Sequence, residues 1–171
     1  MFFRIKRING KEYAYIVKNK WTQNGCRQKV VGYAGRVFKP DKLREITFED
    51  FIAKILKKNH SEYLQKMDFD EAIMDLAKWQ LYVHGAEISG DMAQFAEFFV
   101  TLAGNNVLAG KKNVALKMNE GYFCTRNLKA IMAAGIRESE DDLGSDFAHS
   151  LVNAGLIVPK DVFVKLYEKL S

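Results

Sequence analysis

The sequence contains few cysteines and prolines and no long hydrophobic run. Two cysteines and two prolines occur in 171 residues, and every apolar run falls far short of the roughly 20 residues that a membrane-spanning helix needs. Cys26 and Cys124 form no Cys-x-x-Cys motif, so we expect reduced thiols, although only geometry decides on a disulfide between them. The first ten residues lack the apolar stretch of a signal peptide. We therefore predict a cytoplasmic protein with no membrane contact.

Signatures of catalysis and of cofactor binding are also missing. His60, His84 and His149 lie in separate segments, and none has a metal-ligating partner three or four residues away. No glycine-rich phosphate-binding pattern is present. Cys124 precedes an expected helix N-terminus, but no histidine is indicated as its partner, so an inert buried thiol is favoured over a nucleophile. We predict that the chain is not an enzyme and has no catalytic residues, metal site or cofactor.

Charge is distributed unevenly along the chain. Residues 1–45 carry 12 lysines or arginines against 3 acidic residues, whereas residues 46–171 carry 14 against 18. A strongly basic segment on a more acidic chain suggests contact with a polyanion. Mutual attraction between the two parts, or plain solvation of the charges, is the competing interpretation.

The basic segment has the pattern of β-strands. Asn9-Gly10 and Asn24-Gly25 are hairpin turn signals, because the central positions of a type I′ turn need positive φ. Extended stretches before, between and after them predict a three-stranded antiparallel meander, which we take as a basic β-meander module over residues 1–38. Neither face of its strands is clearly polar, so the pattern does not assign the inward face.

From residue 46 onward the apolar periodicity becomes helical. Thr47 and Thr125 are good N-caps, either Asp68 or Asp70 opens a second long segment, and glycines such as Gly135 suit helix ends in the left-handed conformation. The expected helices cover residues 48–56, 68–83, 91–103, 126–134, 141–154 and 161–170, whereas residues 114–118 suit a short strand or a helical turn. The predicted fold is α+β, with the meander followed by an α-helical bundle of five or six helices as a domain over residues 46–171.

Cations and aromatic side chains alternate through the predicted sheet. Cations supply sequence-independent attraction to phosphates, a two- or three-stranded ribbon fits the major groove, and planar side chains stack on unpaired bases. Lysines on exposed strands also prevent edge-to-edge pairing, which is the competing explanation. The residues expected to contact nucleic acid are Arg4, Lys6, Lys20, Arg27, Lys29 and Arg36 for phosphates, and Trp21 or Tyr33 for stacking.

Residues 13–37 carry a short recurring pattern. It consists of Tyr15, Trp21, Gly25, the run Arg27-Gln28-Lys29-Val30-Val31, Tyr33, Gly35 and Arg36. This pattern resembles the N-terminal segment of a class of insertion-sequence transposases and the opening of many small archaeal and bacterial proteins. The resemblance covers about a fifth of the chain and implies a β-rich terminal module for handling nucleic acid. It implies no activity, because the residues that follow have neither the length nor the strand pattern of a transposase catalytic core.

The sequence therefore leads to two main functional hypotheses, and the third, an unrecognised enzyme, would need a pocket that holds Cys124 with a histidine within reach. In the first, a non-catalytic protein binds nucleic acid, with DNA favoured over RNA, through its basic sheet, and the helical part serves for homodimerisation or partner binding. In the second, the chain is a protein–protein interaction module in which the basic sheet packs on the acidic helical part of its own chain or of a partner.

Overall fold

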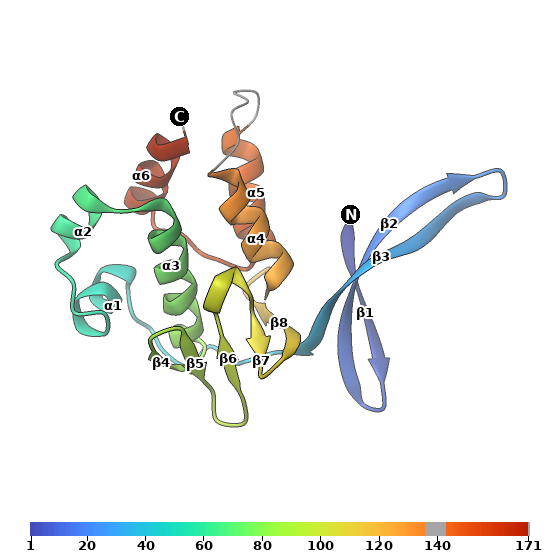
Figure 1. Cartoon of the computed structure of the whole chain (residues 1–171), viewed down its shortest axis with the longest axis horizontal. Helices are drawn as coiled ribbons and strands as arrows, with labels where there is room; N and C mark the ends of the chain where they lie inside the picture. The colour runs from blue at the N-terminus through green and yellow to red at the C-terminus, as the bar shows by residue number, and fades with distance from the viewer. Residues whose placement is uncertain (136–142, 171) are drawn as a thin grey trace.

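The computed structural model describes residues 1–135 and 143–170. Its α+β composition and its N-terminal antiparallel meander confirm those two predictions. Figure 1 shows the helices gathered on one side of the molecule and the N-terminal strands projecting from the other. None of the described helices is long and apolar enough to cross a membrane.

The meander comprises β1 (Phe2–Ile8), β2 (Lys11–Thr22) and β3 (Gly25–Phe38). Asn9 and Gly10 have φ of 49° and 76°, the pair of positive values that a type I′ turn requires. The predicted Asn-Gly signal is therefore confirmed at the first turn. At the second turn the prediction is one residue off. The turn residues are Gln23 and Asn24, and Gly25, with φ of 98°, begins β3 opposite Thr22.

The meander is continuous with the sheet of the remaining chain. The end of β3 pairs in parallel with β8 (Lys112–Met118), with Val37 opposite Ala115. This close approach needs Gly35, whose φ is +123° and where an added Cβ would lie 2.3 Å from the backbone oxygen of Asn113. The described residues form a nine-stranded mixed sheet in the order β1-β2-β3-β8-β7-β6-β5-β4, with β9 beside β8.

The prediction that residues 46–171 form a helical bundle is wrong, because strands alternate with the helices. The additional strands are β4 (Glu87–Ser89), β5 (Met92–Gln94), β6 (Phe99–Thr101), β7 (Leu108–Ala109) and β9 (Gly121–Cys124). A short 3₁₀ turn, η1 (Ala103–Asn105), separates β6 from β7.

The clearest error is the helix expected over residues 91–103, which forms β5 and β6. Aromatic and β-branched residues such as Phe99, Val100 and Thr101 favour a pleated surface, and their burial alternates along the strand. Phe98 stacks on Phe38 of β3, with ring centroids 4.2 Å apart. Phe98 therefore packs where β3 pairs with β8, and this segment does not form one side of a helix.

Six α-helices lie in the described residues. They are α1 (Phe48–Lys54), α2 (His60–Lys66), α3 (Phe69–Val83), α4 (Thr125–Ala134), α5 (Leu143–Asn153) and α6 (Lys160–Leu170). Their packing builds a core around Phe51, Leu76, Phe123, Leu128 and Phe147, all fully buried. The first two residues of the helix predicted over 141–154 lie outside the described residues.

Helix termini follow the predicted caps only in part. The side chains of Thr47 and Asp68 accept hydrogen bonds from the third residue after each, as predicted for N-caps. The predicted cap Thr125 is instead the first residue of α4, and its hydroxyl accepts from the Val107 amide at 2.8 Å. Gly135 is right-handed, with φ of −66°, and not left-handed as expected. A Cβ there would lie 2.8 Å from the ring of Phe69, so packing accounts for this glycine.

Candidate nucleic-acid interface

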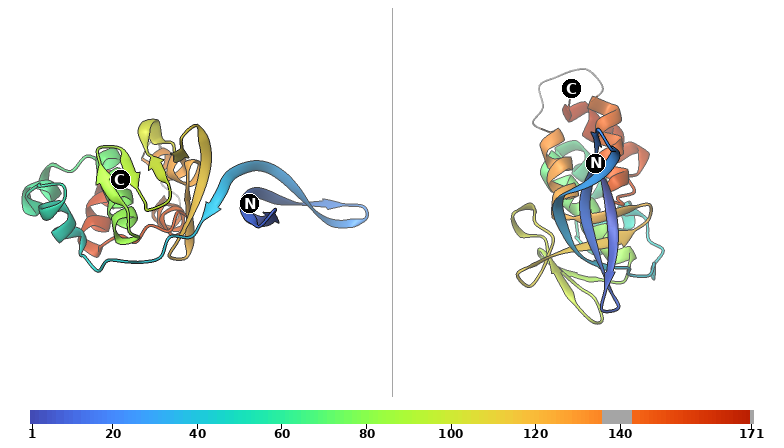
Figure 2. Two further views of the ribbon diagram at one scale, coloured as in Figure 1. Left: turned by 90° about the horizontal axis from the view of Figure 1, so that it is seen from below. Right: turned by 90° about the vertical axis from the view of Figure 1, so that its right-hand side faces the viewer.

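The two longest strands extend beyond the third as a two-stranded ribbon. β1 pairs with β2 only as far as Val17, whereas β2 and β3 continue to pair until Thr22 meets Gly25. The Thr22 hydroxyl donates to the Gly25 carbonyl at 2.8 Å and closes the tip. We call residues 18–29 the ribbon; all of them are exposed. Figures 1 and 2 show it curving away from the helices.

Two irregularities in β3 accompany this curvature. The β2–β3 register shifts twice, so that Val31 and Ala34 have no partner across the ladder. Each shift is a β-bulge, which bends the strand and increases its twist. The ribbon beyond the bulges therefore projects from the sheet at an angle that the strand pattern alone does not specify.

One face of the ribbon carries four cations in two facing pairs. Lys18 lies opposite Lys29, and Lys20 lies opposite Arg27. Alternate residues of a strand share a face, so both pairs occupy the same side. Like charges directly opposite each other destabilise a ladder. Within the described part of the chain, none of these four side chains makes an ion pair or a hydrogen bond.

The other face of the ribbon is uncharged. It presents Asn19, Trp21, Cys26 and Gln28, and the Trp21 side chain is 81% exposed. A tryptophan exposed to this extent near a ribbon tip buries little apolar area within its own chain. Its indole is available for stacking on a planar partner.

The base of the sheet resolves the question of its inward face. Ala14 and Ile16 of β2 are buried against Ala115 and Cys124 of β8 and β9. We call the described residues from 39 onward the body. Lys18 and Lys20 continue this inward side of β2 beyond the point where the body ends. The cation face of the ribbon is thus the outward extension of the side that packs on the body.

The opposite, outward face carries two cross-strand rows. One row joins Arg4, Tyr15 and Tyr33, and the other joins Lys6, Tyr13 and Arg36. These contacts hold the rows together, because the Tyr15 and Tyr33 rings lie 5.3 Å apart, the Lys6 ammonium lies 4.9 Å from the Tyr15 centroid, and Arg4 donates to Gln28 at 3.2 Å. Partial burial, followed by the neighbouring Tyr15 and Tyr13, raises the pKa of Tyr33.

The structure thus divides the predicted contact residues between two faces. Lys20, Arg27 and Lys29 lie together on the cation face of the ribbon. The outward face holds the other members of the predicted set, which are Arg4, Lys6, Tyr33 and Arg36, with Trp21 on the continuation of this face along the ribbon. The prediction omitted Lys18, Tyr13 and Tyr15. Counting back from a turn at Asn24-Gly25 would have placed Lys18 opposite Val31, because the two turn residues are in fact Gln23 and Asn24.

Charges on the meander have few partners in the chain itself. Its one acidic residue, Glu12, pairs with Lys39 at 2.6 Å. Among the described residues, no cation of residues 1–38 forms an ion pair with a carboxylate of the body. The basic charge of the meander therefore faces solvent.

The two thiols lie in different environments. Cys26 is exposed on the ribbon, whereas Cys124 is buried at the N-terminus of α4, and both are free. Burial raises the pKa of the Cys124 thiol, although backbone hydrogen bonds from Asn127 and Arg126 oppose the shift. Among the described residues, no three His, Cys, Asp or Glu side chains are placed to hold a metal ion.

Comparison with known proteins finds no match to this chain among family models, curated proteins or solved structures.

Proposed function

We propose that this chain is a non-catalytic nucleic-acid-binding protein whose ribbon contacts the phosphate backbone of duplex DNA. The observation that supports it is the two pairs of facing cations, Lys18 with Lys29 and Lys20 with Arg27, which have no counter-charge among the described residues. Such a pairing costs stability in the free protein. A row of phosphates would turn this repulsion into attraction and release condensed counterions.

The dimensions of the ribbon suit a groove of the duplex. A two-stranded antiparallel ribbon fits the B-DNA major groove, which is about 12 Å wide. The ribbon has no third strand over residues 18–29, so it can enter the groove without a clash from β1. The cation face would then meet phosphates, and Asn19 and Gln28 on the other face would meet base edges or solvent.

Stacking on unpaired bases is the second component of the proposal. Trp21 at the tip and the tyrosine rows at the base of the sheet offer planar surfaces beside cations. Base–aromatic stacking contributes about 1–3 kcal/mol per base and tolerates any sequence. We therefore expect measurable binding to a single strand as well, through the outward face.

Docking of the basic sheet on an acidic protein surface is the competing hypothesis. The absence of ion pairs between the meander and the described body residues favours a target outside the chain. The four cations occupy alternate positions on two paired strands and share one face. This regular arrangement complements a target whose negative charges are also regularly spaced. A nucleic-acid backbone has such an array.

The helical part is proposed to support homodimerisation or partner binding. Val152 of α5 and Val164 of α6 are 55% and 45% exposed, so apolar side chains of both helices face solvent. Light scattering of the chain over a concentration series tests this part of the proposal, since a dimer would raise the molar mass and a constant monomer mass would contradict it.

Fluorescence anisotropy tests the nucleic-acid proposal directly. A labelled duplex of mixed sequence and a labelled single strand are titrated with the chain at about 50 mM and about 200 mM salt, a range over which phosphate contacts lose affinity steeply. We expect saturable binding to both, with the duplex bound more tightly and weakened more by salt. Lack of salt-dependent binding to either probe would refute the proposal.

A further inference from the structure

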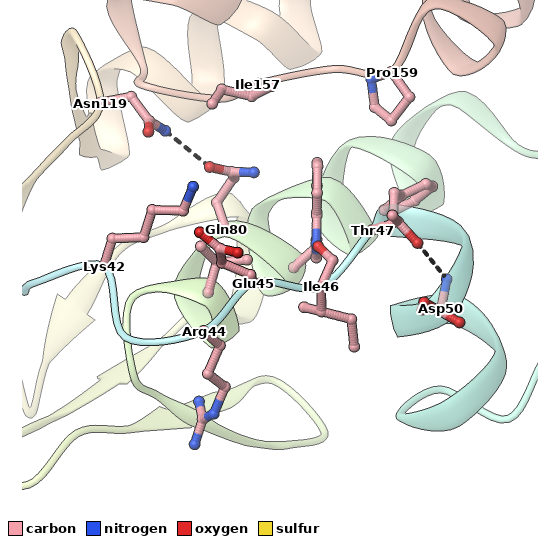
Figure 3. Close-up of a pocket in the computed structure, with 13 residues that line it drawn as sticks. Lys42, Arg44, Glu45, Ile46, Thr47, Asp50, Gln80, Asn119, Ile157 and Pro159 are labelled. Atoms are coloured by element: carbon pink, nitrogen blue, oxygen red, sulfur yellow. Dashed lines mark hydrogen bonds between the residues drawn. The ribbon is translucent and has the colours of Figure 1, made fainter.

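A pocket on the body, away from the ribbon, has the composition of a small-molecule site. It has a volume of about 620 Å³ and lies between the loop before α1, one side of α3, the β8–β9 turn and the segment before α6 (Figure 3). Ligand sites typically enclose about 300–1,000 Å³. Its apolar wall includes Trp79, Ile157 and Pro159. Its polar lining consists of Lys42, Arg44, Glu45, Thr47, Asp50, Gln80 and Asn119, of which Asp50 pairs with Lys54.

A buried amide faces this pocket with its nitrogen unpaired. The Asn119 side-chain nitrogen donates to the Gly155 carbonyl at 2.7 Å and to the Gln80 side-chain oxygen at 2.8 Å. Because the Gly155 carbonyl can only accept, this geometry fixes the orientation of both amides. Gln80 is 2% exposed, yet among the described residues its Nε2 has no hydrogen-bond partner. This nitrogen is not fully enclosed, since the Tyr63 hydroxyl is the one fully buried side-chain polar atom without a partner among the described residues. It is reachable from the pocket, so a ligand acceptor could take the place of water as its partner.

The loop that carries the charged groups is held rigidly. The Leu43 and Arg44 amides both donate to the Val83 carbonyl, at 2.9 and 3.0 Å. The Arg44 guanidinium donates to the Tyr82 and Ala86 carbonyls and stacks 4.1 Å from the Tyr82 ring centroid. Arg44 is therefore occupied within the fold, whereas its neighbours Lys42 and Glu45 are left free.

Lys42 and Glu45 supply one charge of each sign at the mouth of the pocket. Neither side chain has an ion pair or hydrogen bond among the described residues. Figure 3 shows both on the same side of the pocket as Gln80 and Asn119. The free groups on this side are thus two donors, Lys42 and Gln80 Nε2, and two acceptors, Glu45 and Asn119 Oδ1. A head group that is both anionic and cationic complements all four.

The other side of the pocket is apolar. The Trp79 indole is held by a hydrogen bond from its Nε1 to the Ile46 carbonyl at 3.0 Å, and the residue is 8% exposed. Ile157 is 51% exposed although it lines the pocket, and Pro159 lies beside it. An apolar ligand body would bury the exposed part of Ile157.

We propose that this pocket binds a free α-amino acid with an apolar or aromatic side chain. The carboxylate would accept from Gln80 Nε2 and Lys42, and the ammonium would donate to Asn119 Oδ1 and Glu45. The side chain would lie against Trp79, Ile157 and Pro159. This inference is independent of the ribbon and of nucleic-acid binding.

The intrinsic fluorescence of Trp79 provides the assay. The chain has two tryptophans, so Trp21→Phe leaves Trp79 as the single reporter. This variant is titrated with L-phenylalanine, with 3-phenylpropanoate, which lacks the ammonium, and with phenethylamine, which lacks the carboxylate. We expect saturable binding of L-phenylalanine with a dissociation constant of about 1 mM or below, and at least about tenfold weaker binding of each analogue.

Variants locate the binding in the pocket. Lys42→Met in the same background should weaken L-phenylalanine binding about tenfold, because it removes a donor to the ligand carboxylate. The Lys42 side chain is exposed, so the change leaves the core intact. Lys111→Met, a change of equal charge on the exposed β7–β8 turn, should leave the affinity unchanged. No saturable signal, equal loss in both lysine variants, or 3-phenylpropanoate bound as tightly as L-phenylalanine would each overturn the proposal.

Discussion

Neutralising the cation face of the ribbon gives the strongest test of how the chain meets nucleic acid. The change is Lys18→Gln, Lys20→Gln, Arg27→Gln and Lys29→Gln in one variant. All four side chains are exposed and have no interaction among the described residues, so the change removes charge without removing a contact. The fold should be kept or slightly stabilised, because like charges that face each other across the ladder are removed.

The size of the effect follows from counterion release. Each phosphate contact contributes about 0.9 to the slope of log affinity against log salt for B-DNA, so four contacts give a change of ~3.6. A slope of this size corresponds to about a 150-fold loss of affinity between about 50 and about 200 mM salt. The slope measured for the variant should therefore be smaller by about 3.6, and the variant should bind the duplex more weakly than the unaltered chain at low salt.

Anisotropy titrations at several salt concentrations measure the slope, and circular dichroism checks that the variant is folded. A control of equal charge change replaces Lys54, Lys66, Lys165 and Lys169 on the helices by glutamine; three of these pair with a carboxylate of their own helix. The control should alter the slope by less than about one unit. If the ribbon variant keeps the slope of the unaltered chain, or if the control loses as much, the ribbon is not the phosphate-binding surface.

Three further predictions concern the fold. Gly35→Ala should destabilise the chain by about 3–5 kcal/mol in urea unfolding, because its φ of +123° and the Asn113 backbone leave no room for a Cβ; Gly10→Ala, at φ +76° in open space, should cost only about 1 kcal/mol. Burial raises the pKa of the Cys124 thiol in the folded chain. The stability that this protonated thiol contributes is fully present below the unfolded pKa of about 8.5 and is lost as the pH rises through the folded pKa. Between pH 7 and pH 10, Cys124→Ala should therefore lose less stability than the unaltered chain. Lys58→Met should cost about 1–3 kcal/mol because it leaves the buried Asp75 carboxylate unpaired, and a further Asp75→Asn change should recover part of this loss. An equal effect of the two glycine variants, an unchanged pH dependence, or no recovery by the second change would contradict the respective argument.

Local chemistry accounts for the elements that sequence patterns predicted well. Asn9-Gly10 determines its turn because both residues adopt positive φ at little cost. Thr47 and Asp68 cap their helices because a short side-chain oxygen reaches the amide three residues on. Each of these signals acts within a few residues, so no distant part of the chain can easily override it.

The prediction of a helix over residues 91–103 is wrong because the conformation of this segment depends on residues far away in the sequence. Closely spaced aromatic residues suit either a buried helix or a strand that packs on other aromatic rings. Here Phe98 stacks on Phe95 and on Phe38, and Phe38 belongs to the far N-terminal sheet. Only the pairing of β3 with β8 brings that ring into position.

In the candidate interface, too, some features follow from local sequence and others depend on distant residues. Composition located the cations in the N-terminal sheet, and strand alternation placed Lys18 and Lys20 on one face. Which face packs inward depends on Ala115 and Cys124, far along the chain, and the facing of the ribbon cations depends on the register set by the two bulges at Val31 and Ala34. The separation of the predicted contacts into a cation face and a tyrosine-bearing face therefore required the structure.

The sequence by itself determined the Asn9-Gly10 turn, the caps at Thr47 and Asp68 and the unequal distribution of charge, because these depend on backbone preferences and side chains only a few residues apart. Tertiary structure alone decided that the meander joins a nine-stranded sheet, that four cations face each other on a ribbon, and that Lys42, Gln80 and Asn119 line one pocket. These arrangements bring together residues that are distant in sequence, and their cost in chain entropy is offset only when the whole core is formed.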